Sequence, residues 1–129
     1  MPKKTMLTEA EWKIMLVLWE HSPRTMMEVT RALEEETGWS KHTVATMLKR
    51  MIVKGTVRAD QSGSVRTYVP AADKQQVARE QTQTLLRRLF DGKTSLMVSN
   101  MVEQGEIDDD EMREIIGILQ EASGKRKEP

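Results

Sequence analysis

The sequence contains no cysteine, and only two of its 129 residues are histidine. Without cysteine the chain can form no disulfide, no thiolate metal site and no cysteine nucleophile. The histidines, His21 and His42, are isolated from one another, so neither belongs to a cluster with the spacing of metal ligands. We therefore expect neither a metal site nor a cofactor.

Long apolar segments are also missing. No apolar run approaches the roughly 20 residues that cross a bilayer, and the start Met-Pro-Lys-Lys lacks the apolar region of a signal peptide. We therefore expect a cytoplasmic protein. A length of 129 residues, with 38% hydrophobic residues, allows one ordinary domain or two small ones.

Motifs of catalysis are missing as well. Ser40, His42 and the carboxylates form no nucleophile elbow, phosphate loop or metal-ligand pattern. A helix cap is a sufficient role for Ser40. We expect no catalytic residues and no enzyme activity.

The formal net charge of the chain is zero, but basic and acidic residues are distributed unevenly along it. Residues 1–72 hold eleven basic and eight acidic residues, whereas residues 73–129 hold nine basic and twelve acidic ones. Within residues 38–70 there are six basic residues and one acidic residue. This distribution indicates two parts with different roles, and the basic stretch of the first part is typical of a nucleic-acid contact.

Residues 38–55 carry the most complete set of helix signals in the chain. Ser40 can cap the first turn, and Gly55 can end the helix behind Lys54. Helical spacing places Val44, Met47, Leu48 and Met51 on one stripe. The remaining face offers hydrogen-bond donors and no carboxylate, as a DNA major groove requires, although a solvated amphipathic helix has a similar pattern. We expect the DNA-binding residues of this helix to be Lys41, His42, Thr43, Thr46, Lys49 and Arg50.

Two helices are predicted before this one. The pairs Thr8 with Glu11 and Thr25 with Glu28 are capping boxes, and each predicts a helix start. The first helix should end before Ser22-Pro23 and the second at Thr37-Gly38. Three helices joined by short turns indicate a helix-turn-helix arrangement in which the third helix recognises DNA.

A β-hairpin is predicted after the third helix. Residues 57–60 and 65–69 have strand character, the loop Gln61-Ser62-Gly63-Ser64 joins them, and Pro70 closes the second strand. A hairpin in this place is a wing, and Arg58 and Arg66 can contact phosphates from it. The predicted fold is mainly α with a small β-hairpin wing, and residues 1–72 form a winged helix-turn-helix DNA-binding domain.

Residues 73–129 are predicted to form a helical dimerisation domain. Three helices are expected, from Asp73 to Phe90, from Thr94 to Glu103 and from Asp108 through Leu119, followed by a frayed polar tail from Gly124. Three helices without a disulfide or a metal make a marginal core, which pairing with a second copy would complete. We expect the dimer contacts to involve Leu85, Leu89, Met112, Ile115, Ile116 and Leu119.

Several residues match a known pattern. These are Glu11-Trp12, Met15 and Trp19 in the first helix, Trp39-Ser40, Thr43-Val44, Thr46, Leu48 and Arg50 in the third, Lys54-Gly55 at its end, and Tyr68 in the wing. With these residues the chain resembles the BlaI/MecI/CopY family of bacterial transcriptional repressors, of the penicillinase repressor type. The similarity covers nearly the whole chain, but Ala45 and His42 depart from the residues usual there. The resemblance therefore does not supply the operator sequence.

The resemblance implies a homodimer that binds a palindromic operator in double-stranded DNA and is released by a signal. In β-lactam-responsive relatives, which regulate antibiotic resistance, a membrane sensor protease leads to a cut between an Asn and an apolar residue. The matching residues here are Asn100 and Met101. The copper-responsive branch carries a Cys-x-Cys signature that this chain lacks, so a copper-type switch is not expected. Two alternatives stay open, a family repressor with another inducer and a winged-helix module that binds proteins.

Overall fold

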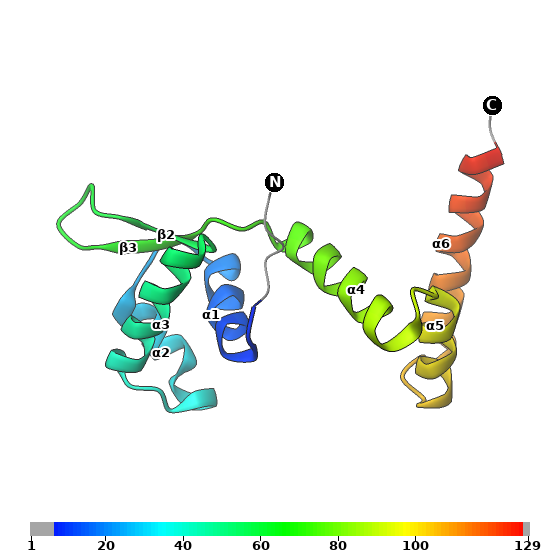
Figure 1. The fold of residues 1–129 in the computed structure, drawn as a ribbon, viewed down its shortest axis with the longest axis horizontal. Coiled ribbons are helices and arrows are strands. Elements are labelled where there is room, and N and C mark those ends of the chain that lie inside the picture. The colour runs from blue at the N-terminus through cyan, green and yellow to red at the C-terminus, as the bar shows by residue number, and fades with distance from the viewer. Residues whose placement is uncertain (1–6, 128–129) are drawn as a thin grey trace. The chain divides into compact units, whose positions relative to one another are not determined.

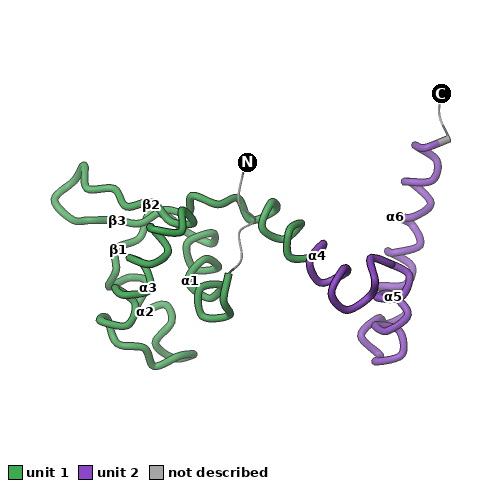
Figure 2. The backbone as a smooth tube through the Cα atoms, viewed as in Figure 1, with its two compact units in different colours: residues 1–82 green, residues 83–129 purple. Residues whose placement is uncertain are grey.

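The computed structural model describes residues 7–127, which belong to two compact units, Met1–Thr82 and Gln83–Pro129 (Figure 2). The division falls inside the long helix α4, whereas the sequence places the functional boundary at residues 72 and 73, before that helix begins. The two criteria differ because α4 starts on the first unit and continues into the second. The boundary at 72 stays a prediction about function.

Residues 7–70 of the first unit form three helices and a small sheet (Figure 1). The helices are α1 (Glu9–Glu20), α2 (Met26–Thr37) and α3 (Lys41–Lys54). The antiparallel sheet has the strand order β1-β3-β2 and consists of β1 (Arg24–Thr25), β2 (Val57–Asp60) and β3 (Thr67–Pro70). This order of three helices and a hairpin confirms the predicted winged helix-turn-helix.

Local side-chain signals set the helix ends as the sequence predicts. Thr8 and Thr25 each complete a capping box with the glutamate three residues later. The Ser40 Oγ accepts a hydrogen bond from the Thr43 backbone N–H at 3.2 Å. Gly55 ends α3 with φ at 87°, in the left-handed region that a side chain would strain.

The core of this unit joins all three helices and the wing. Its fully or almost fully buried side chains are Ile14, Met15, Val17, Leu18, Val29, Leu33, Val44, Leu48, Met51, Val57 and Tyr68. Trp12 and Trp19 lie at the edge of the core, edge to face, with ring centres 5.5 Å apart. The buried face of α1 is wide because α1 packs against both α2 and β3.

The sheet differs from the predicted hairpin in two ways. The strand β1 was not predicted, and it pairs Arg24 with Tyr68 and Thr25 with Thr67. The prediction that the second strand begins at Val65 is wrong, since β3 begins at Thr67, opposite Asp60. The Asp60 Oδ1 accepts a hydrogen bond from the Ser62 N–H at 2.9 Å, which turns the chain at the end of β2. The loop is therefore longer than the sequence indicates.

The C-terminal part of the chain consists of helices. They are α4 (Lys74–Phe90), α5 (Thr94–Glu103) and α6 (Asp109–Lys127). Asp73 and Asp108 cap α4 and α6 by accepting from the N–H groups of Gln76 and Glu111, as predicted. The predicted frayed tail from Gly124 is wrong as far as Lys127, because α6 continues to that residue, and an ion pair between Lys125 and Glu121 at 3.5 Å lies on its last turns. The rest of the predicted tail, residues 128–129, lies outside the described residues. Within residues 7–127, no helix has the length and apolar content that crossing a membrane requires.

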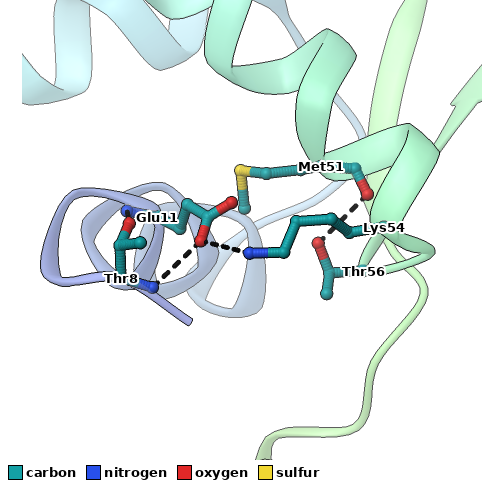
Figure 3. A network of polar contacts seen from close by, with 5 residues as sticks. All are labelled: Thr8, Glu11, Met51, Lys54 and Thr56. Atoms are coloured by element: carbon teal, nitrogen blue, oxygen red, sulfur yellow. Dashed lines mark hydrogen bonds and ion pairs between the residues drawn. The ribbon is translucent and has the colours of Figure 1, made fainter. Parts of the chain in front are cut away.

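A polar contact between Glu11 and Lys54 connects α1 with the end of α3 (Figure 3). The Glu11 side chain is 4% exposed, and its Oε1 accepts hydrogen bonds from the Lys54 Nζ at 2.8 Å and from the Thr8 N–H at 2.9 Å. Burial raises the pKa of Glu11, but the hydrogen bond and charge of Lys54 and the hydrogen bonds with Thr8 lower it by more. The pKa of Glu11 therefore lies below its ordinary value, and the carboxylate is ionised in the folded protein.

We predict that Glu11→Gln lowers the free energy of unfolding by roughly 1–3 kcal/mol near neutral pH, because a charged hydrogen bond is lost. A carboxylate whose pKa is lower in the folded state adds stability above its unfolded-state pKa, and this stability is lost as the pH falls through the folded-state pKa. Below about pH 4.5 the wild type should therefore lose stability more steeply than Glu11→Gln.

Urea unfolding at a series of pH values measures both effects. Glu9→Gln removes the same charge from an exposed position of the same helix and controls for net charge. If the wild type and Glu11→Gln showed parallel pH dependence, Glu11 would not be the group responsible.

Candidate nucleic-acid interface

Helix α3 has one side in the core and one side in solvent. Val44, Leu48 and Met51 are completely buried, which fixes the rotation of the helix about its axis. The opposite side is exposed and carries no acidic residue. The predicted contact residues lie here: Lys41, His42, Thr46, Lys49 and Arg50 are exposed, and Thr43 is half-buried. The arrangement presents hydrogen-bond donors and positive charge along one face.

The two threonines of this face differ in their hydrogen bonds. The Thr46 hydroxyl donates to the His42 carbonyl at 3.0 Å, which leaves its lone pairs facing outward as acceptors. The Thr43 Oγ1 lies 3.2 Å from the Ser40 Oγ, within the cap of α3. The Thr43 hydroxyl is therefore partly engaged in the N-terminal cap of α3, whereas the Thr46 hydroxyl oxygen can accept a hydrogen bond from a ligand.

The wing adds two exposed arginines. Arg58 lies on β2, opposite Val69 of β3, and Arg66 lies in the loop just before β3. The Arg66 guanidinium stands 5.6 Å from the centre of the Tyr68 ring, at a cation–π distance. This contact orients Arg66 without removing its five N–H donors. Both arginines can reach an anionic surface.

Asp60 is the single acidic residue within residues 38–70. Its carboxylate is engaged in hydrogen bonds within the wing loop. The hydrogen bonds from the Ser62 N–H and hydroxyl lower the pKa of Asp60. The carboxylate is therefore ionised, but it serves to turn the loop. The basic face of α3 contains no acidic side chain that would repel phosphate.

Comparison with known proteins assigns the chain to a family. A family model described as penicillinase repressor matches residues 7–121. The chain belongs to the penicillinase repressor family. Members of this family are DNA-binding transcriptional repressors and not enzymes, so this chain is a DNA-binding transcriptional repressor, and the prediction of no enzyme activity is confirmed.

Individual relatives agree with this assignment. The penicillinase repressor of Bacillus licheniformis is 32% identical over 128 residues, which cover 99% of this chain and all of that one. The methicillin resistance regulatory protein MecI of Staphylococcus aureus strain N315 is 21% identical over 113 residues, covering 88% and 92% of the two chains. Among solved structures, the monomeric form of Bacillus licheniformis BlaI in complex with the blaP half-operator is 36% identical, with a TM-score of 0.52. The match covers 59% of this chain and 93% of that one.

In this penicillinase repressor family member, most predicted dimer residues carry exposed apolar side chains. Leu85, Leu89, Met112, Ile116 and Leu119 are between 38% and 67% exposed, and Ile115 is half-buried. The sequence analysis missed Ile118, which is 65% exposed and broadens the apolar surface of α6. Helical spacing from Ile115 could have indicated it.

The candidate cleavage residues lie in the last turn of α5 (Thr94–Glu103). Asn100 is exposed, and Met101 is 38% exposed. None of the residues of α5 is buried, and its first turn has no side-chain cap. A helix with so little support opens locally at low cost.

Two basic residues of this repressor have roles that the sequence did not indicate. The Arg24 Nε donates to the His21 carbonyl at 2.8 Å, and β1 brings Arg24 beside Tyr68, at the base of the wing. Lys54 belongs to the basic stretch, but its ammonium is paired with the buried Glu11. The pairing of Arg24 with Tyr68 and the ion pair of Lys54 with Glu11 have no local sequence signal, because they join residues 44 and 43 positions apart. Among the described residues, no group of histidine and carboxylate side chains is arranged to hold a metal ion.

Proposed function

We propose that this repressor binds a palindromic operator as a homodimer, with α3 of each copy in a major groove and each wing on the adjacent phosphate backbone. The observation that carries the proposal is the exposed face of α3, which offers donors and no carboxylate while its other side is held in the core. The half-operator in the solved BlaI complex supports it, since one copy on half a site leaves the other half for a second copy.

The contacts divide into base-reading and phosphate-binding groups. Thr46, Lys49 and Arg50 lie along the middle of the exposed face, where side chains of a recognition helix reach base edges. Lys41, His42 and Thr43 lie in the first turn of α3, where backbone N–H groups and the helix dipole favour phosphate. Arg58 and Arg66 bind phosphate from the wing. Affinity then depends on all these residues, whereas specificity depends on the first group.

The dimer is proposed from the apolar residues that unit Gln83–Pro129 leaves exposed. Of the residues described in this unit, Ile107 is the one with a buried side chain, although α4, α5 and α6 all carry large apolar residues. A unit with so small a core gains little stability by itself. A second copy offers the same apolar surface, so an isologous contact covers both.

Release of the repressor is proposed to follow cleavage between Asn100 and Met101. The cut separates α6 from the DNA-binding unit, so the tethering of two heads on one operator is lost. The partner is a membrane sensor protease of the β-lactam-receptor type. Support for this site comes from the exposure of Asn100 and from the weakly supported helix around it.

A family repressor with another inducer binds the operator in the same way but is released intact. A gel-shift titration with genomic fragments at two salt concentrations tests operator binding itself, because operator binding is fragment-specific at high salt and phosphate binding alone is not. The mass of the repressor after induction separates the two modes of release.

We predict that Arg50→Ala costs roughly 1–3 kcal/mol of binding free energy on the operator and much less on random DNA, because a base contact is lost. Arg58→Ala and Arg66→Ala should weaken both complexes similarly, and each should lower the salt slope by about one. Titrations on both DNAs at several salt concentrations measure these effects. An equal loss on both DNAs for Arg50→Ala would assign Arg50 to the backbone.

We predict that Leu119→Asp converts the dimer to a monomer and reduces operator affinity by about 100-fold or more, because a charge is placed in the proposed contact and tethering is lost. Sedimentation and gel-shift titration measure the two effects. Gln120→Asp adds the same charge at the exposed neighbouring residue and should change neither. A wild-type monomer that binds a palindrome tightly would rule out the proposed dimer.

We predict that exposing cells to a β-lactam yields a repressor fragment that ends at Asn100. Mass spectrometry of the repressor identifies the cut, and a gel shift of the same extract shows loss of the operator complex. Asn100→Ala should slow the cut, whereas Gln104→Ala changes a similar side chain outside the bond and should not. Intact repressor coming off the operator would exclude cleavage and favour another inducer.

A further inference from the structure

The pair of Glu11 and Lys54 joins two helices that are far apart in sequence. Glu11 lies in the first turn of α1 and Lys54 in the last turn of α3, 43 residues later, and they are 2.8 Å apart (Figure 3). Close packing in this unit runs from α1 to α2 and from α2 to α3. The ion pair therefore adds a direct link between α1 and the end of the recognition helix.

Lys54 is the starting point of a chain of contacts that leads into the wing. After Gly55, the Thr56 hydroxyl and N–H both donate to the Met51 carbonyl, at 3.2 and 3.0 Å. The Thr56 carbonyl accepts from the Ala71 N–H at 2.8 Å, at the exit of the wing. Trp19 of α1 then donates its Nε1–H to the Ala72 carbonyl at 2.9 Å. The entry of the wing is thus held to α3, and its exit is held to Thr56 and to Trp19, about two turns along α1 from Glu11.

Stability alone does not account for this ion pair, in which the carboxylate of Glu11 is buried and the side chain of Lys54 is 36% exposed. Taking a carboxylate out of water is costly, and an apolar pair of similar volume is often as stable as a buried ion pair. Among the described residues, none donates a hydrogen bond to the buried Oε2 of Glu11, so the carboxylate depends on Lys54 and Thr8 at its other oxygen. Such a pair tolerates only a narrow range of positions for α3.

We infer that Glu11 and Lys54 are positioning residues for operator recognition: their pair sets the placement of α3 and the wing, and Lys54 itself contacts no phosphate. This inference rests on the proposed operator binding. Base-reading side chains act only when they are held to within about 0.5 Å of their working position, so a small rotation of α3 lowers specific binding. Contacts with phosphate are less demanding, so binding to random DNA is retained.

The test compares Lys54→Met with Lys41→Met, the same substitution at an exposed phosphate-binding position in the first turn of α3. Each is titrated on a palindrome preferred by the wild type and on random DNA at several salt concentrations. Lys54→Met should reduce operator affinity by about tenfold and leave random-DNA affinity and the salt slope unchanged. Lys41→Met should lower the salt slope by about one. A lower salt slope for Lys54→Met would assign Lys54 to phosphate and overturn the inference.

A double variant separates positioning from folding. Glu11→Leu with Lys54→Met leaves no buried charge without a partner, so it should unfold at a urea concentration close to that of the wild type, even if Lys54→Met alone does not fold. It should still show a reduced ratio of operator to random-DNA affinity. Restoration of both stability and this ratio would make the pair purely structural. If the wild type preferred no palindrome over random DNA, the proposed function would be wrong as well. If every variant kept the wild-type preference for the palindrome, only this inference would be wrong.

Discussion

Burial of one side of α3 is the constraint on which the rest of the structure depends. Val44, Leu48 and Met51 have no exposed surface, so the helix cannot rotate without bringing apolar side chains into water or polar ones into the core. This packing decides that Lys49 and Arg50 face outward. A recognition surface made in this way is as rigid as the core behind it, which suits side chains that must match base edges.

The wing depends on the same core through different contacts. Val57 and Tyr68 are buried among the helices, so the base of the hairpin is fixed while its loop projects beyond them (Figure 1). Arg66 lies against the ring of Tyr68, and Arg58 lies on the neighbouring strand. Core packing at the base thus fixes the backbone from which the wing arginines extend, and the length of their side chains allows them to reach the phosphate backbone.

The C-terminal unit differs from the DNA-binding unit in how its apolar residues are packed. Its last helix, α6, begins at a side-chain cap, but the apolar residues of the unit stay largely exposed in one copy. The core of the DNA-binding unit is therefore complete in one chain, whereas in the proposed dimer the C-terminal unit is completed by a second copy. Loss of that proposed contact would lower operator affinity without unfolding the DNA-binding unit. The proposed dimer would also make occupancy of the operator depend on repressor concentration.

The sequence by itself determined the helices, their starts and the amphipathic face of α3, because caps such as Ser40 and the spacing of Val44, Leu48 and Met51 act within a few residues. It also indicated the hairpin and the basic stretch. The pairing of β1 with β3 and the ion pair of Lys54 with Glu11 could be found in the tertiary structure alone. Both features join segments that are more than 40 residues apart, so no local pattern indicates them. Lys54 is the clearest case: its sequence neighbours resemble those of a DNA-binding lysine, but its ammonium pairs with the buried carboxylate of Glu11, 43 residues away.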